Sequence, residues 1–318
     1  MVLYTLAWCM EKSEKEAGSI YAQARETCPD YCFPSRFEEI QILEHAVAAY
    51  NDCRAAYYLG NLLYGKEHYD AAIEKWEEAL SGGETYYVLL RNLGMGYYNN
   101  QRDFPKALDL MKRSYELAPQ DPHLVFDYNH LLQLTNSPVE QRLELLQQDL
   151  AMTERRDDLY LELVKACNQA GDCQKAIDLL DKHVFTPCEG GEHAIIEQYT
   201  FAHFKLGREA MAQGDYTTAL KYFRDGQVYP KNLGAGVWNI AMKVPCKYYE
   251  AECLEQIDAK EAKAAYKFLD NLGLDFFSYM YQPAIDYYRA LAIRKLGRED
   301  EAEALLKDCV DNWSKKLQ

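Results

Sequence analysis

Three groups of residues in this 318-residue chain are of types that could bind a ligand or take part in chemistry. The first group mixes aromatic, amide and charged side chains: Tyr57, Asn61, Tyr64, Arg91, Asn92, Tyr98, His123, Asp127 and His130. The second is an acidic segment, Glu189, Gly190, Gly191, Glu192 and His193, and the third is Asn232 with Gly234. The chain contains neither a GxSxG nor an HExxH motif, so we expect no enzymatic activity and no catalytic residues.

The first group could hold an extended peptide. Asparagine offers both donors and acceptors, so Asn61 and Asn92 could bind the N–H and C=O groups of a peptide backbone. Tyrosine side chains add flat contact area at a low cost in side-chain entropy. The alternative is that these residues pack against neighbouring turns, because some of the 26 tyrosines must be structural. We do not expect a clamp for a C-terminal carboxylate, since Arg91 stands alone and Asp127 and His130 occupy positions where positive charge would be needed.

The second and third groups are weaker candidates. Glu189, Glu192 and His193 are suitable metal-ligand types, but their spacing fits no standard metal motif. The segment from Asn232 to Gly236 resembles a phosphate-binding loop only superficially, because it does not follow a strand. Turn glycines and a helix cap explain it equally well. We therefore expect no metal and no cofactor.

The ten cysteines allow one further metal site, from Cys28, Cys32, His45 and Cys53. The chain has no CxxC pair, and most cysteines fall at helix positions that suit a small apolar residue. We expect free, buried thiols in a reducing cytosol instead.

Composition restricts the class of partner. Hydrophobic residues make up 48% and charged residues 27%, as in globular proteins, and the net charge is −15. Nucleic acids and anionic membrane surfaces are polyanions, so we expect neither as a partner. No run approaches the ~20 apolar residues of a membrane span, and the apolar N-terminus lacks the basic region of a signal peptide. A cytoplasmic location is expected.

A 34-residue repeat between Asn51 and Pro119 indicates the elements that position these residues. Gly60 and Gly94 recur in the first helix of each copy, where a second helix crosses too closely for a larger side chain. Ala72 and Ala107 serve the same purpose in the second helix. Such a period is typical of tetratricopeptide helix pairs. The predicted fold is all-α, a right-handed α-α superhelix of about eight helix pairs, plus one unpaired helix over 37–47.

The repeats predict a single solenoid over residues 1–318. The clearest copies cover 53–86, 87–121, 157–190, 200–233 and 283–316. Pro122 should open a helix, and a second helix is expected over 139–152. Loops at 185–192 and 229–236 should lie on one edge of the solenoid, and a third is expected at 271–282. The abrupt start, with Val2, Leu3 and Trp8 exposed, suggests a segment of a longer chain.

The first helices of successive pairs line the concave face of a helical solenoid. The first group of residues lies on these helices, so we expect it to form a ligand groove.

Several stretches together resemble a more particular family. They are Tyr58 to Tyr64, Trp76-Glu77, Arg91 to Gly94, Arg155 to Leu159, Phe185 to Glu192 and Tyr229 to Gly234. They resemble the C-terminal tetratricopeptide region of large bacterial proteins of unknown function that carry an N-terminal galactose-mutarotase-like β-sandwich. The resemblance implies a carbohydrate-related protein whose β-sandwich is missing here. Cys188 stands where that family has tryptophan, which weakens any expectation that this loop stacks on a sugar.

Two functions follow from these features. The first is a non-catalytic interaction or scaffold module that binds an extended peptide, or a partner domain such as its own missing β-sandwich, in the concave groove. The second is an accessory domain of a carbohydrate-related protein, in which the two glycine-rich loops complete a sugar site on the missing sandwich.

Overall fold

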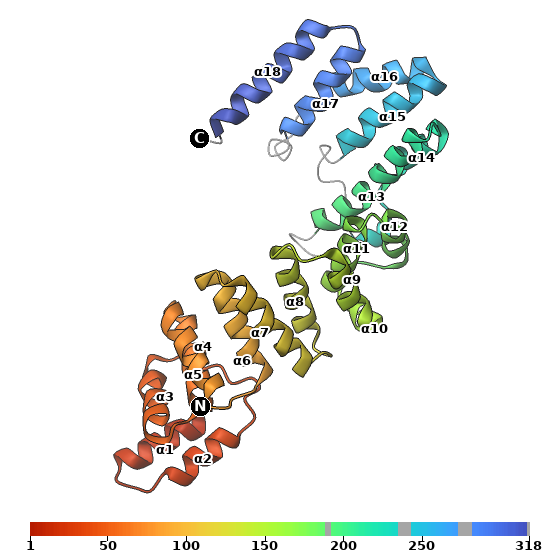
Figure 1. The fold of residues 1–318 in the computed structure, drawn as a ribbon. Coiled ribbons are helices and arrows are strands. Elements are labelled where there is room, and N and C mark those ends of the chain that lie inside the picture. The colour runs from red at the N-terminus through yellow and green to blue at the C-terminus, as the bar shows by residue number, and fades with distance from the viewer. Residues whose placement is uncertain (188–191, 235–242, 273–281, 317–318) are drawn as a thin grey trace. The chain divides into compact units, whose positions relative to one another are not determined.

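The computed structural model describes residues 1–187, 192–234, 243–272 and 282–316, and every regular element within these ranges is a helix (Figure 1). This confirms the predicted all-α fold class, with helix pairs stacked as in an α-α superhelix. The chain divides into two compact units, residues 1–138 and 139–318. No helix of the described residues is long and apolar enough to cross a lipid bilayer.

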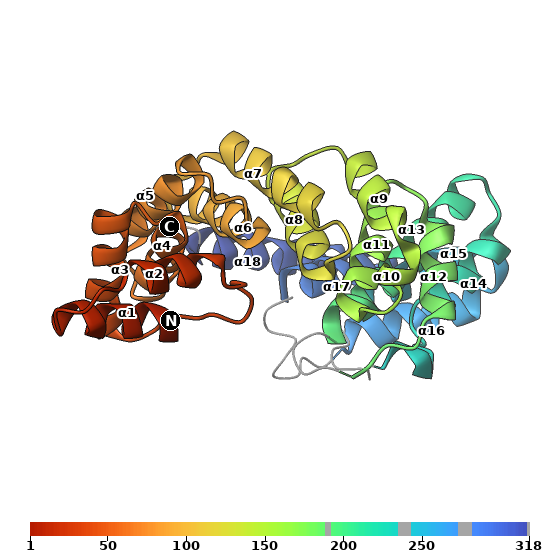
Figure 2. The same ribbon diagram turned by 90° about the horizontal axis from the view of Figure 1, so that it is seen from below.

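The first unit contains eight α-helices and one π-helical turn. They are α1 (Val2–Lys12), α2 (Gly18–Glu26), α3 (Phe37–Tyr50), α4 (Cys53–Gly65), α5 (Tyr69–Ser81), α6 (Tyr87–Gly96), η1 (Tyr97–Gln101), α7 (Phe104–Leu117) and α8 (Pro122–Leu134). In Figure 2 the first helices α4, α6 and α8 form one row, and the second helices α5 and α7 form another.

Aspartate side chains fix where these helices begin. Asp52, Asp103 and Asp121 stand just before α4, α7 and α8, and each accepts a hydrogen bond from a backbone N–H of the first turn. These N–H groups have no partner inside the helix, so the caps stabilise the helix starts. Pro122 occupies the first turn of α8, as the sequence predicted.

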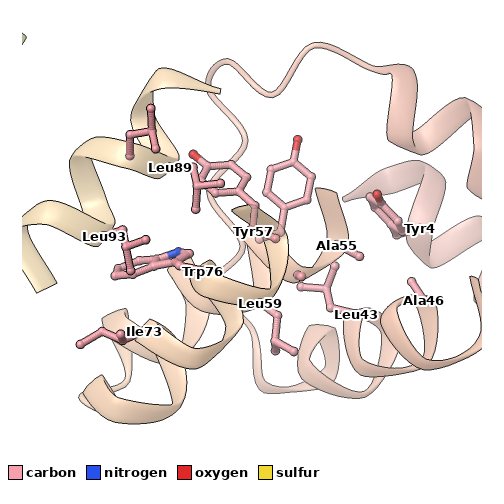
Figure 3. Close-up of a cluster of buried hydrophobic side chains, with 14 of the residues drawn as sticks. Tyr4, Leu43, Ala46, Ala55, Tyr57, Leu59, Ile73, Trp76, Leu89 and Leu93 are labelled. Carbon is pink, nitrogen blue, oxygen red and sulfur yellow. The ribbon is translucent and has the colours of Figure 1, made fainter. Parts of the chain in front are cut away.

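The close helix crossings predicted at the repeated glycines are confirmed. A Cβ added to Gly60 would lie 2.3 Å from Cδ1 of Trp76, and one added to Gly94 would lie 3.1 Å from the carbonyl oxygen of Ala107. Ala72 and Ala107 are fully buried. Figure 3 shows Trp76 of α5 beside Leu93 of α6, within a core that extends from Tyr4.

The π-helical turn η1 accommodates one extra residue in the second repeat. Gly60 and Gly94 are 34 residues apart, but the spacing between Ala72 and Ala107 is one residue longer. The surplus lies within Tyr97–Gln101, which follows directly from α6. A single π turn widens the helix instead of lengthening the following loop. Ala107 therefore still reaches its crossing with α6.

The unpaired helix predicted over 37–47 is α3, which is slightly longer than expected. It packs against α1 and α4. Its Leu43 and Ala46 are fully buried beside Ala55 of α4 (Figure 3). The helix thus joins the first pair to the regular repeats through one continuous hydrophobic core.

The second unit contains the remaining helices. They are α9 (Val139–Gln148), α10 (Leu150–Thr153), α11 (Asp157–Gln169), α12 (Cys173–Lys182), α13 (Glu192–Ala212), α14 (Tyr216–Asp225), η2 (Lys231–Leu233), α15 (Val244–Ile257), α16 (Ala259–Asp270), α17 (Gln282–Lys295) and α18 (Glu299–Lys316). The single helix predicted over 139–152 is wrong. It breaks at Asp149, whose side chain caps the short α10 by accepting from the backbone N–H of Met152. Most of the expected loop at 271–282 lies outside the described residues.

Replacing Gly60 by alanine should destabilise the chain. The new methyl group has no room beside the buried Trp76 ring, and overpacking of this kind costs about 1–3 kcal/mol. Gly65→Ala in the last turn of α4 is the matched control, because its Cβ meets nothing within 4 Å. Urea denaturation of both variants measures the difference. Equal free energies of unfolding for the two variants would contradict the close-crossing argument.

Candidate functional site

The candidate site is a row of polar side chains on α4, α6 and α8, the first helices of three successive pairs. Asn61 lies on α4, Arg91 and Asn92 lie on α6, and Asp127 lies on α8. All four are partly exposed. Hydrogen bonds connect them into one chain across the three helices, which we call the polar ladder.

Asn61 anchors the ladder to the core. Its Oδ1 accepts one hydrogen bond from the indole Nε1–H of Trp76 at 3.0 Å and a second from Nδ2 of Asn92 at 3.1 Å. Both lone pairs of this oxygen are therefore used. Burial raises the pKa of the Tyr57 hydroxyl, and a hydrogen bond with Asn61 opposes that shift. Asn61 is thus held mainly by its own neighbours.

Asn92 is held in place but keeps spare hydrogen-bonding capacity. It donates one N–H to Asn61, and its Oδ1 accepts from Nη1 of Arg91 at 3.2 Å. The amide has two donors and two lone pairs, and the described residues use one of each. A donor and an acceptor therefore stay available on a side chain whose orientation is fixed from both sides.

Arg91 is paired with Asp127 at the far end of the ladder. Its Nε lies 2.5 Å from Oδ2 of Asp127, and the side chains are 37% and 19% exposed. Because a carboxylate already neutralises the guanidinium, Arg91 is poorly placed to attract a second one. This pairing supports the sequence-based expectation that the groove is no carboxylate clamp.

Aromatic residues flank the ladder, with one exception among those predicted. Tyr64 donates its hydroxyl to Asn100 at 3.2 Å and packs on Trp76, while Tyr98 packs on Phe104. Tyr57, however, is only 4% exposed and belongs to the hydrophobic core. It offers almost no accessible area to a ligand. The prediction that Tyr57 lines the groove is therefore corrected to a role in core packing.

The two predicted histidines are exposed on α8. His123 lies in the first turn of α8, where its backbone N–H donates to the side chain of Asp121 at 2.9 Å. His130 lies two turns later and stacks on Phe126 with ring centroids 6.2 Å apart. Both side chains add polar and aromatic groups to the exposed surface of α8.

The predicted loop residues of the second unit are only partly described. Glu189, Gly190 and Gly191 lie outside the described residues, as does the side chain of Glu192. His193 is half-buried in the first turn of α13.

Asn232 and Gly234 have a structural role. The Nδ2 of Asn232 donates to the carbonyl oxygens of Leu180 and His183, both at 2.8 Å, and so caps the C-terminus of α12. Its own carbonyl accepts from the backbone N–H of Phe185 at 2.8 Å. Gly234 has φ +67°, and a Cβ there would lie 2.5 Å from the Phe185 carbonyl oxygen. The described residues of the two loops therefore meet on one edge, as predicted, and the Asn232 side-chain nitrogen is occupied.

A histidine–aspartate pair that the sequence did not indicate secures the same edge. The Nε2 of His183 lies 2.7 Å from Oδ1 of Asp157, and the backbone N–H of Thr186 donates to Oδ2 at 2.7 Å. The His183 ring stacks on Tyr160 with centroids 4.0 Å apart. Burial would raise the pKa of Asp157, but these hydrogen bonds outweigh it and lower the pKa. The separation of 26 residues gave no sequence signal for this contact.

No group of three His, Cys, Asp or Glu side chains among the described residues could hold a metal ion. His45 of the alternative cysteine site lies 2.5 Å from Glu11. The nine cysteines that the structure describes are free, but only Cys167, Cys173, Cys246 and Cys253 are buried. Cys9 and Cys28 are exposed, so the expectation of buried thiols is wrong for them. Cys188 lies outside the described residues.

Comparison with known proteins agrees with the repeats. Residues 57–122 match the tetratricopeptide repeat family, a range that runs from α4 to the start of α8. The chain therefore carries tetratricopeptide repeats in the segment that contains Asn61, Arg91 and Asn92. A galactose-mutarotase-like partner domain stays a prediction.

Several solved structures of low sequence identity align with this chain. A chain from the structure of Naa15/Naa10 bound to HypK-THB aligns with a TM-score of 0.52 at 16% identity, covering 96% of this chain and 43% of that one. YrrB, described as a TPR protein with an unusual peptide-binding site, aligns with a TM-score of 0.44 at 14% identity, covering 71% and 97%. A tetratricopeptide repeat protein from Parabacteroides merdae gives 0.40 at 13%, covering 92% and 97%. At 16% identity the likeness to the first of these chains concerns the fold alone.

Asn61→Ala should destabilise the fold more than an exposed asparagine does. The indole N–H of Trp76, a residue only 2% exposed, would lose its partner, which costs about 1–3 kcal/mol. Asn100→Ala is the control, because Asn100 also accepts a side-chain hydrogen bond but is exposed to water. Thermal and urea unfolding measure both. A loss for Asn61→Ala no larger than that for Asn100→Ala would refute the anchoring role.

Asp157 should make the stability of the chain sensitive to acid. Its pKa in the folded chain is lowered from the usual 3.8, so its stabilising effect is complete above that value. The effect is lost as the pH falls through the lower, folded pKa. Asp157→Asn should therefore be less stable at pH 6 and show a shallower decline between pH 6 and pH 3.

Urea denaturation at each pH gives the free energies of unfolding. Asp311→Asn, at an exposed position of α18, should leave the pH dependence unchanged. A wild-type slope retained in Asp157→Asn would show that the carboxylate does not contribute.

Proposed function

We propose that this chain is a non-catalytic protein-interaction module that binds an extended peptide segment of a partner across α4, α6 and α8. The observation that carries the proposal is Asn92, whose amide is oriented by Asn61 and Arg91 and keeps one donor and one acceptor that no described residue uses. A peptide unit presents the complementary pair, a C=O and an N–H. Tetratricopeptide repeats in this segment support the same function.

The flanking surface suits side chains of mixed character. Tyr64, Tyr98 and Phe126 are partly exposed and are already packed on neighbouring rings. Aromatic groups with restricted motion provide contact area at little entropic cost. His130 and Asp127 add polar groups at the α8 end. The expected ligand is an uncharged or mixed-charge peptide with apolar side chains at intervals.

The charge pattern argues against selection of a free C-terminus. Arg91 already faces Asp127, so a terminal carboxylate would compete with an existing ion pair. Amidated and free-acid forms of the same peptide should therefore bind alike. The partner would be contacted along its backbone rather than at its end.

Asn92→Ala should weaken peptide binding while leaving the fold intact. The probe is a set of peptides selected from a random 12-residue phage library on the full chain. Loss of the two hydrogen bonds should raise the dissociation constant by about ten- to thirtyfold, at roughly 0.7–1 kcal/mol for each. Fluorescence anisotropy with labelled peptides measures it.

Asn312→Ala, at an exposed position of α18, is the matched control and should bind as the wild type does. Circular dichroism confirms that each variant is folded. Failure to select any peptide, or selected peptides that bind Asn92→Ala as tightly as the wild type, would overturn the proposal.

A further inference from the structure

A pocket of about 380 Å³ lies in the second unit between α15 and α16, beside Gln227 just after α14. Its apolar lining comes from Val244, Leu254, Ala265, Phe268 and Leu269. The volume is at the lower end of the range for small-molecule sites, which are mostly apolar with a few placed polar groups. The pocket therefore suits a compact apolar ligand rather than a polypeptide segment.

The carboxylates of this pocket are already satisfied by neighbouring groups. Glu250, only 5% exposed, accepts from Gln227 at 2.9 Å, Lys247 at 2.9 Å and Arg224 at 3.1 Å. Burial would raise the pKa of Glu250, but these hydrogen bonds lower it. Arg224 also reaches Glu261 at 2.5 Å. The positive charges of Lys247 and Arg224 thus offset the negative charges of the two carboxylates, Glu250 and Glu261.

Lys243 brings a positive charge that no described carboxylate balances. It lines the pocket at the start of α15, and its Nζ lies 4.9 Å from the centroid of the Tyr229 ring. No acidic side chain of the described residues lies within ion-pair distance of it. Burial lowers the pKa of Lys243 from its usual 10.5. Among the described residues the Lys243 ammonium is held by an aromatic face alone, and a partly buried cation in such a setting gains from an anionic partner.

We propose that this pocket binds a small monocarboxylate with an apolar body, its carboxylate paired with Lys243 and its hydrocarbon against Phe268 and Leu269. One unmatched cation calls for one negative charge. A phosphate dianion would need a second free cation, and both Lys247 and Arg224 are engaged with Glu250. Because the chain carries a net charge of −15, its general field does not attract anions, and selectivity depends on this local charge.

This site is independent of the peptide groove. The groove lies in residues 57–130 of the first unit, whereas every lining residue of the pocket lies in residues 227–269 of the second. Lys243→Met and Asn92→Ala therefore test separate sites. Either site can fail without affecting the conclusion about the other.

Calorimetric titration of the full chain with octanoate and with 1-octanol tests the proposal. The two probes share a hydrocarbon tail and differ in charge. Octanoate should bind at least about tenfold more tightly than octanol, as expected for one charge-assisted hydrogen bond in a partly buried site. Lys243→Met should remove this difference and leave octanol binding unchanged.

Two further variants separate charge from packing. Lys263→Met, on the exposed side of α16 and outside the pocket lining, should bind both probes as the wild type does. Phe268→Ala should weaken both probes alike, because the 48% exposed ring contributes apolar contact and no charge. The proposal is overturned if octanoate does not bind, if it binds no tighter than octanol, or if Lys243→Met retains the preference for octanoate.

Discussion

The contact between Gly60 and Trp76 is the constraint on which the first unit depends. With no side chain at Gly60, the Trp76 ring lies directly against α4, where a Cβ would be 2.3 Å from its Cδ1. The indole N–H then reaches Asn61, and Asn61 orients Asn92 on the next helix. The close packing at Gly60 thus determines, through two hydrogen bonds, how the Asn92 amide is oriented on the surface.

Much of the fold was predictable because it depends on local repetition. The spacing of Gly60, Ala72, Gly94 and Ala107 reports directly on helix crossings, and aspartates before α7 and α8 mark where helices begin. The break at Asp149 was missed because the apolar pattern continues through it. The Asp149 side chain caps the start of α10, and the break there involves neither a glycine nor a proline.

The candidate site was predictable in its residues but not in their roles. Helix register places Asn61 and Asn92 on first helices. It does not reveal that Trp76 donates a hydrogen bond to Asn61, or that Arg91 orients Asn92. Tyr57 was assigned to the groove because its position follows the same register, but its ring is buried among other tyrosines. Asn232 caps α12 at Leu180, from which it is 52 residues away in the sequence, so no local pattern predicts this contact.

The π turn at Tyr97–Gln101 has a consequence for the way such chains change in length. An inserted residue stored as a bulge inside a helix leaves the loop and the crossing geometry intact. Length variation can then accumulate in repeats without loss of the stacked architecture. A search for repeats of strictly constant length will overlook copies that contain such a bulge. A chain can therefore contain more helix pairs than the repeat pattern of its sequence indicates.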